Sequence, residues 1–153
     1  MIRRHAHRIG AVCYILWGIL HIGVSAAVLY QLWANGGTAA LAVFGSAVPA
    51  EDLPQNLGGV ASGVLVQHAW SLAVFGLFAV IVGAVLNWRN SRIGYWLNLG
   101  VVSGDDLGFI FAFLIPGYIR LVDGLGGPAL WVLAVIFSTI GLLTNPGATR
   151  PER

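Results

Sequence analysis

Charged residues are scarce in this sequence. Only 9% of the 153 residues are Asp, Glu, Lys or Arg, and lysine is absent, whereas a soluble domain carries about 25% charged residues. Hydrophobic residues make up 58% of the chain. These few charges do not suffice to cover the surface of a soluble domain, and the composition also excludes a disordered chain and a nucleic-acid-binding protein. An integral membrane protein in a lipid bilayer remains.

Cysteine is nearly absent as well. Because Cys13 is the single cysteine, the sequence excludes an internal disulfide, a cysteine-based metal cluster and a dithiol redox pair. The glycine patterns of nucleotide-binding loops and the serine-hydrolase elbow are missing. The run of residues 105–109 resembles a diphosphate-binding DDxxD motif only in part, since Phe109 stands where the third aspartate would be. We find no internal repeat of the kind that builds many transporters.

Long apolar runs define the predicted architecture. About 20 apolar residues, at 1.5 Å rise each, cross a bilayer as a helix. Four runs qualify, at residues 9–33, 61–88, 93–115 and 128–144, and none contains Lys, Arg or Glu. We therefore predict a single all-α membrane domain over residues 1–153, folded as a four-transmembrane-helix bundle. The alternative of a cleaved signal peptide ending near residues 24–26 fits less well, because the first apolar run continues past that point.

The arginines predict an orientation for this bundle. Seven of the eight fall on one side of a four-span arrangement, and only Arg120 falls on the other. Because arginine and lysine are enriched in cytoplasmic segments, we expect both termini in the cytoplasm, and a prokaryotic cytoplasmic (inner) membrane as the location. The seven arginines are Arg3, Arg4, Arg8, Arg89, Arg92, Arg150 and Arg153.

The loop of residues 34–60 joins the first two predicted spans on the outer side. Residues 39–44 are apolar enough to form one or two helical turns, and prolines at positions 49 and 54 interrupt the chain after them. Long structured loops are often lids over a binding site. The sequence leaves open whether this loop is a lid or an interfacial helix that closes the bundle.

Asp105 and Asp106 are adjacent, near the middle of the third predicted span. A carboxylate at the bilayer centre costs about 2.5–3.5 kcal/mol on insertion scales, so such residues face a bundle interior or a water-filled cavity. Neighbouring helix positions point about 100° apart, so the two side chains are expected to flank one groove. Asn98 precedes Asp105 by two helical turns and shares its face.

Other polar residues of the predicted spans lie at similar depths. On the first span Tyr14, Trp17, His21 and Ser25 recur at helical spacing and form one stripe. We predict a polar pocket inside the bundle, with an acid–base site made by residues from three helices. The catalytic candidates are Asp105, Asp106, His21 and His68, and the candidate pocket residues are Trp17, Gln67, Trp70, Ser71, Asn98, Phe109 and Ser138.

Small residues recur on two of the predicted spans. Gly100, Gly104 and Gly108 are spaced by four residues, and Gly76, Ala79 and Gly83 form a similar face on the second span. Such spacing lets helix backbones approach closely. We expect tight helix packing there, within the bundle or in a homo-oligomer formed through the glycines of the third span.

Several functions fit the predicted pocket. We favour binding of a lipophilic small molecule, such as an isoprenoid, a sterol-like lipid or a quinone, with isomerase- or cyclase-type acid–base chemistry. A mononuclear transition-metal site at His21, His68 and Asp105 is a possibility, although no metal-ligand spacing is present. A proton-coupled transporter or channel subunit that acts as an oligomer is one alternative. A non-catalytic accessory subunit of a membrane complex is another.

Overall fold

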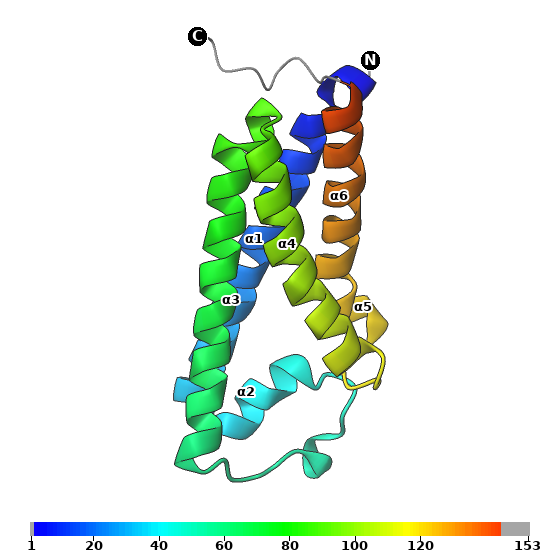
Figure 1. Cartoon of the computed structure of the whole chain (residues 1–153). Coiled ribbons are helices and arrows are strands. Elements are labelled where there is room, and N and C mark those ends of the chain that lie inside the picture. Colours follow the sequence, from blue (N-terminus) through cyan, green and yellow to red (C-terminus); the bar gives the residue numbers. More distant parts are fainter. Residues whose placement is uncertain (1, 145–153) are drawn as a thin grey trace.

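Four long antiparallel helices form the body of the protein (Figure 1). The computed structural model describes residues 2–144, with side chains from His5 onward. The four helices are α1 (Ile2–Asn35), α3 (Gly59–Val85), α4 (Arg92–Phe109) and α6 (Gly126–Thr144). Each lies in a helical segment that is long and apolar enough to cross a membrane. The prediction of an all-helical protein with four such spans is confirmed, and the predicted tail at residues 145–153 lies outside the described residues.

The helix ends differ from the predicted ones by a few residues. The first helix begins at Ile2 rather than at residue 9, because a helix continues beyond the apolar zone wherever its polar residues meet water. The third span continues past α4 as a π-helical turn, η3 (Ile110–Leu114), in which Ile115 N–H donates to the carbonyl oxygen of Ile110 at 2.9 Å. The sequence analysis did not anticipate this turn, and π turns are rare and often occur at functional sites.

Two short helices and a 3₁₀ turn complete the end of the bundle opposite the N-terminus of α1. They are α2 (Gly37–Phe44), η1 (Ala50–Asp52) and α5 (Leu121–Gly124). The predicted helical turns at residues 39–44 are thus confirmed as part of α2. A second 3₁₀ turn, η2 (Asn87–Arg89), links α3 to α4 at the other end, where Asn90 adopts a left-handed conformation with φ of 56°.

The loop between α1 and α3 is bonded to the chain between α4 and α6. Ala47 N–H donates to the Tyr118 carbonyl oxygen at 3.1 Å, and Arg120 N–H donates to Ser46 Oγ at 3.2 Å. The Arg120 guanidinium donates to Asp123 at 2.7 Å. Hydrogen bonds from the Ser46 hydroxyl and the Arg120 guanidinium hold the pKa of Asp123 below its ordinary value. We call these five residues the loop contact.

The tightest helix packing surrounds α1. A Cβ added at Gly76 of α3 would lie 2.6 Å from the Gly18 carbonyl oxygen, and one added at Gly141 of α6 would lie 2.6 Å from His7 Cβ. The predicted packing face of Gly76, Ala79 and Gly83 does lie against α1, since all three are buried and two of them approach its backbone.

The glycine stripe of α4 is different. A Cβ added at Gly100, Gly104 or Gly108 would meet no atom of the described residues within 4 Å, so the expected close packing of this stripe is not formed among them. Helix α4 also makes far fewer backbone contacts with its neighbours than α1 makes with α3 and α6. The expectation that these glycines pack a helix tightly inside the bundle is therefore corrected, and α4 is the most loosely packed of the four long helices.

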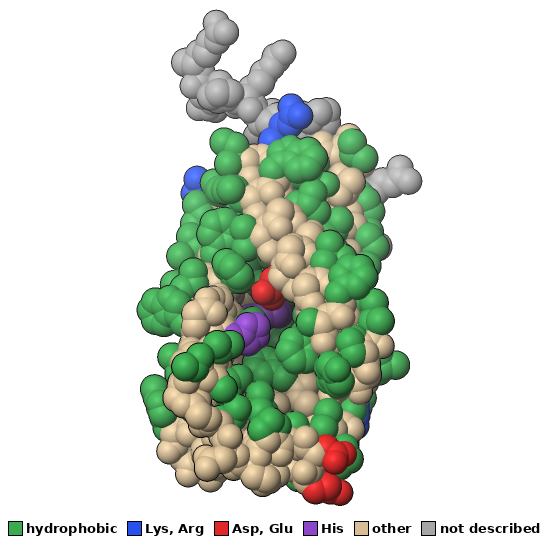
Figure 2. Space-filling view, turned by 60° about the horizontal axis from the view of Figure 1, so that its bottom comes forward, with side chains coloured by type: hydrophobic (Ala, Val, Ile, Leu, Met, Phe, Trp, Pro, Cys, Tyr) green, Lys and Arg blue, Asp and Glu red, His purple; other side chains and the backbone are tan. Residues whose placement is uncertain are grey.

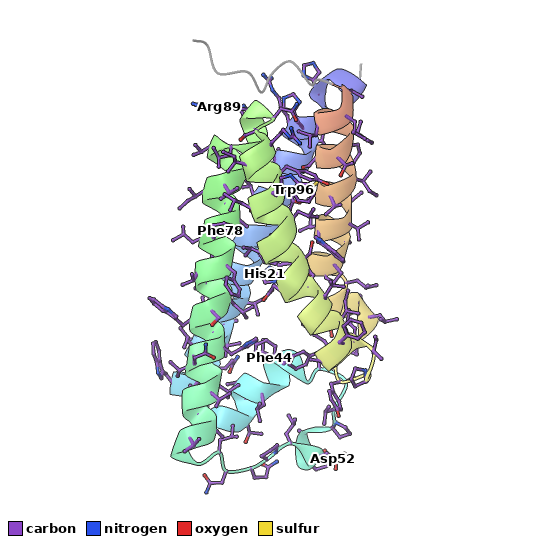
Figure 3. The ribbon with its side chains drawn as sticks, in the orientation of Figure 1. His21, Phe44, Asp52, Phe78, Arg89 and Trp96 are labelled. Carbon is purple, nitrogen blue, oxygen red and sulfur yellow. The ribbon has the colours of Figure 1, made fainter. Side chains whose placement is uncertain are left out.

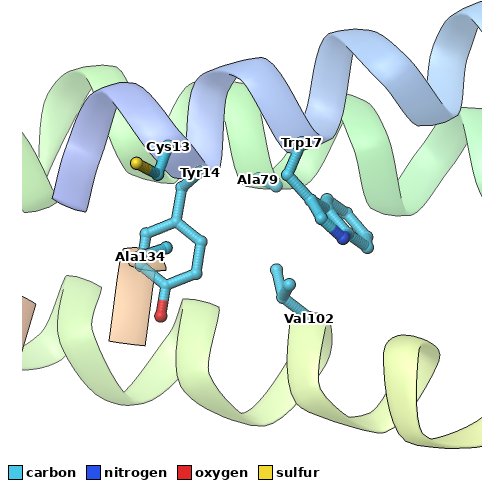
Figure 4. Packing of buried hydrophobic residues seen from close by; sticks show 6 residues of the cluster. All are labelled: Cys13, Tyr14, Trp17, Ala79, Val102 and Ala134. Carbon is cyan, nitrogen blue, oxygen red and sulfur yellow. The ribbon is translucent and has the colours of Figure 1, made fainter. Parts of the chain in front are cut away.

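A buried cluster fills the bundle between α1, α3, α4 and α6 (Figure 4). Tyr14 and Trp17 of α1 point toward Val102 of α4, and all three are fully buried. These large side chains span the distance between α1 and α4, whose backbones are not closely packed. The cluster closes the bundle on the side of the N-terminus. It consists of Cys13, Tyr14, Trp17, Ala79, Val102 and Ala134.

Candidate functional site

A cavity of about 520 Å³ lies between this cluster and α2. All four long helices contribute to its wall, and α2, η3 and α5 complete it. Figure 2 shows the cavity as a hollow with hydrophobic side chains around it and with histidine and acidic side chains inside it. Ligand cavities in proteins commonly measure about 300–1,000 Å³ and combine an apolar lining with a few polar groups. This cavity fits that description.

His21 and Asp105 form the polar pair of the cavity. His21 Nε2 lies 3.4 Å from Asp105 Oδ2, and the two side chains are only 12% and 15% exposed. His21 Nδ1 lies 2.8 Å from the carbonyl oxygen of Trp17. A carbonyl oxygen only accepts, so Nδ1 carries a hydrogen and donates it. In the neutral ring Nε2 is then the basic nitrogen, and it faces Asp105.

Asp106 takes a different partner from its neighbour. Trp17 Nε1–H donates to Asp106 Oδ2 at 2.7 Å, and both side chains are fully buried or nearly so. The other carboxyl oxygen, Oδ1, is buried beside Gly127 and has no hydrogen-bond partner among the described residues. A Cβ at Gly127 would lie 3.2 Å from this oxygen, so the glycine makes room for the carboxyl group.

The two aspartates together hold one turn of α1. Trp17 and His21 are four residues apart, so they lie one above the other on the same helix face. Their rings stack with centroids 3.6 Å apart and planes inclined by 24°. Asp106 bonds Trp17 and Asp105 faces His21. The two neighbouring carboxyl groups of α4 therefore contact side chains of α1 that are one helical turn apart. The indole ring therefore forms a rigid support for the imidazole.

His68 is a second polar group in the same cavity. It lines the wall on α3, and the Phe44 ring of α2 lies edge-on to it with centroids 5.1 Å apart. Ser25 Oγ donates to the Ala69 carbonyl oxygen across α1 and α3, so His68 lies near the level of residue 26. That is five residues, or about 7.5 Å at 1.5 Å each, beyond His21. The cavity thus has two polar positions at different levels, on the neighbouring helices α1 and α3 (Figure 3 labels His21 and Phe44).

Aromatic rings form the part of the wall next to His68. Phe44, Phe109 and Phe113 are in contact, with centroids 5.6 Å apart for Phe44 with Phe113 and for Phe109 with Phe113. Phe113 belongs to the π turn, which sets the direction of its side chain. Of these rings, Phe109 was predicted as a pocket residue, and Phe44 was missed. The apolar character of residues 39–44 was the available signal for Phe44, whereas no sequence pattern marks a π turn.

Six of the seven predicted pocket residues, all except Phe109, do not line the cavity. Gln67 and Ser71 hydrogen-bond each other on the exposed side of α3, and Trp70 is 68% exposed. Asn98 is buried two helical turns before Asp105 in α4. Its side-chain amide is hydrogen-bonded to the side-chain amide of Asn87, and the bonded atoms are 3.0 Å apart. Ser138 is buried against α1 beside Gly10. Of the predicted set, the structure places His21, His68, Asp105, Asp106 and Phe109 around one cavity, with Trp17 directly behind His21.

A metal site gains no support from this arrangement. Among the described residues, no group of three or more His, Cys, Asp or Glu side chains is placed to hold one ion. His21, His68 and Asp105 share the cavity, but His68 lies about 7.5 Å further along the bundle than His21. The metal hypothesis stays a prediction that only analysis of the purified protein tests.

Comparison of the chain with protein-family models, with curated proteins and with solved structures finds no match. The function is therefore inferred from the cavity and from the residues around it.

Proposed function

We propose that the protein binds an apolar small molecule in this cavity, with a polar atom of the ligand placed at the His21–Asp105 pair. The observation that carries the proposal is a cavity of about 520 Å³ whose largely apolar wall contains a carboxyl group and an imidazole in contact. Buried ionisable groups in a membrane-spanning bundle are costly and usually functional. The ligand class that fits is a lipophilic molecule with a hydrogen-bonding group, such as an isoprenoid, a sterol-like lipid or a quinone.

We further propose that the pair exchanges protons with the ligand. Asp105 in its acid form donates a proton to one atom of the ligand, and the carboxylate with His21 Nε2 then accepts a proton from another atom. The net result moves a double bond and consumes no co-reactant, which is the balance of an isomerisation. Exclusion of water by the apolar wall favours such proton transfers.

The two aspartates have separate roles in this proposal. Asp105 is the acid or base, because it lines the cavity and faces His21. Asp106 is a positioning residue, because its hydrogen bond holds Trp17 and the stacked Trp17 ring holds His21. His68 provides the second polar contact for the ligand, from α3.

A single-chain channel is less well supported than a binding site. Tyr14, Trp17 and Val102 fill the bundle between the cavity and the N-terminal end of α1 (Figure 4). Helix α2 borders the cavity at the other end. A cavity that ends at Tyr14, Trp17 and Val102 suits a bound molecule better than a continuous path for ions.

The proposal includes an orientation of the bundle in the membrane. Arg8, Arg89 and Arg92 lie at one end of the bundle, and the Arg8 guanidinium lies 5.5 Å from the centre of the Trp88 ring there. Figure 3 shows Arg89 at the opposite end from Asp52. We infer that the arginine-rich end faces the cytoplasm. A reporter fused after residue 153 that is active only in the cytoplasm should then be active.

Native mass spectrometry of the purified protein tests the binding proposal. The wild-type chain should retain a lipophilic molecule from its membrane, or bind an added isoprenoid alcohol, at one molecule per chain. Asp105→Asn should reduce occupancy at least tenfold, and His21→Gln should do the same. Ser71→Ala is the matched control, since its hydroxyl bonds within α3 outside the cavity.

Three results would decide against the proposal. If the wild-type chain binds no lipophilic molecule, the binding function is wrong. If Asp105→Asn and Ser71→Ala bind equally well, the ligand does not use the polar pair. A stoichiometric transition metal in the purified protein, lost in the His21 and His68 variants, would favour the metal hypothesis instead.

A further inference from the structure

The cavity wall is open on one side, between α3 and α4. These helices are joined by the short turn at Asn87–Arg89 and diverge with distance from it (Figure 1). They pack closely only near the turn, where a Cβ added at Gly94 would lie 3.1 Å from Asn87 N. Further along, at the level of the cavity, no side chain of α4 fills the space beside Gly104 and Gly108.

The residues at this opening are small or exposed. Gly104 and Gly108 of α4 both line the cavity and are both exposed, and Phe75 of α3 lines it as well and is 38% exposed. All three belong to helical segments that are apolar enough to span a membrane. In a bilayer this side of the bundle faces lipid chains, so the opening leads from the cavity into hydrocarbon.

At the end of the bundle opposite the N-terminus of α1, the cavity is bordered by α2. Helix α2 contributes Val43 and Phe44 to its wall, and the loop contact bonds the following segment to the chain before α5. Its backbone bonds, Ala47 N–H to the Tyr118 carbonyl at 3.1 Å and Arg120 N–H to Ser46 Oγ at 3.2 Å, join segments that are far apart in sequence. At the α2 end Val43 and Phe44 narrow the cavity, whereas beside Gly104 and Gly108 it opens toward the bilayer.

We infer that the opening between α3 and α4 is a subsite for a hydrocarbon tail, and that the ligand reaches the cavity sideways from the bilayer. This inference rests on the proposed function. The polar groups that mark the head-group position lie on the inner wall: the His21–Asp105 pair, and Asp106 Oδ1, which is buried without a hydrogen-bond partner among the described residues. The ligand class is a molecule with a compact polar head and a long linear or isoprenoid chain that extends past Gly104 and Gly108 into the lipid.

Two alcohols with the same head and different tails test the inference. Geraniol has a short isoprenoid chain and geranylgeraniol has a long one, and both are titrated against the full chain in lipid nanodiscs. Gly104→Phe places a ring in the opening, and its Cβ meets no neighbour within 4 Å. Gly100→Phe is the matched control, because its Cβ is equally free and Gly100 does not line the cavity. Gly108→Phe is a second blocking variant in case Gly104→Phe fails to fold.

We expect the wild-type chain to bind the long alcohol at least tenfold more tightly than the short one. A blocking variant should reduce affinity for the long alcohol at least tenfold and leave affinity for the short alcohol within about threefold. The control should leave both affinities at the wild-type level. The far-UV circular dichroism of each variant confirms that the helices are intact before affinities are compared.

The possible failures are distinguishable. If the short alcohol binds through Asp105 but the long alcohol gains nothing, or if blocking and control variants behave alike, the tail subsite is wrong and the proposed function stands. A blocking variant that weakens both alcohols equally would place the ring in the head-group cavity and also overturn the subsite. If neither alcohol binds the wild-type chain, both the proposed function and this inference fail.

Discussion

Replacing Gly76 by alanine tests the contact that holds α1 and α3 together. The added methyl carbon would lie 2.6 Å from the Gly18 carbonyl oxygen and 3.0 Å from Ile22 Cγ1. Ordinary contacts between carbon and a carbonyl oxygen are about 3.3–3.6 Å, so the helices would have to separate by about 0.7–1.0 Å. Because the oxygen belongs to the backbone, no side-chain rotation relieves the clash.

The expected cost follows from two opposing effects. Overpacking of a close contact destabilises by about 1–3 kcal/mol. Alanine in place of glycine stabilises a helix by about 0.5–1 kcal/mol. We therefore expect Gly76→Ala to lower the free energy of unfolding by about 1–2 kcal/mol, which is a large share of the stability of a small domain.

Gly100→Ala is the control, because its methyl group would meet no atom within 4 Å. Only the helical gain remains there, so stability should rise by about 0.5–1 kcal/mol. Unfolding in mixed micelles with increasing dodecyl sulfate, followed by far-UV circular dichroism, measures both variants. A loss of stability in Gly76→Ala together with a gain in Gly100→Ala supports the close packing of α1 and α3. Equal changes in the free energy of unfolding of the two variants would refute it. A loss in Gly100→Ala that depends on protein concentration would instead reveal the oligomer contact that the sequence suggests.

Two further predictions concern buried and exposed polar contacts. In a double-mutant cycle, Trp17→Phe and Asp106→Leu should show a coupling of about 0.6–1.7 kcal/mol in the free energy of unfolding, and additive effects would contradict the hydrogen bond at 2.7 Å. Because the loop contact lowers the pKa of Asp123, its carboxylate stabilises the docked loop above the ordinary pKa of an aspartate, and this stabilisation is lost as the pH falls through the lowered pKa. Hydrogen exchange at the Ala47 amide measures this, as the ratio of the observed rate to the intrinsic rate at each pH. The ratio should rise in that acid range in the wild type, and in Asp123→Asn it should be high at higher pH as well. A wild-type ratio that does not change with pH would contradict the role of Asp123.

The sequence was sufficient to predict the spans, because a bilayer imposes one length and one composition on every helix that crosses it. It was sufficient to align Trp17 with His21, because four residues make about one helical turn. The sequence did not predict which residue each aspartate contacts. Which carboxyl group meets Trp17 and which meets His21 depends on how far α4 is shifted along α1, and contacts distant in sequence set that shift.

The α2 residues that line the cavity were missed for a related reason. Val43 and Phe44 reach the cavity because α2 packs against α1 and α3 through Ala40 and Phe44, and because the loop contact bonds the segment that follows α2. Gln67, Ser71 and Trp70 were included because they are near His68 in sequence, but neighbours on a helix point in different directions. The depth of polar residues in the spans therefore predicts the level of a site along the bundle, but it does not predict which side chains line the site.

The loose packing of α4 connects the site with the fold. Small residues on α3 meet another backbone, while Gly104 and Gly108 of α4 border the cavity, although both sets recur at about one helical turn. Since α4 has few close backbone contacts with α1, the side chains of Asp105 and Asp106 make much of the connection between them, through His21 and Trp17. The groups proposed to act on the ligand thus also hold the helix that carries them. Loss of binding in an Asp106 variant has to be compared with its stability, whereas Asp105, which lines the cavity and has the looser contact, separates the two effects more clearly.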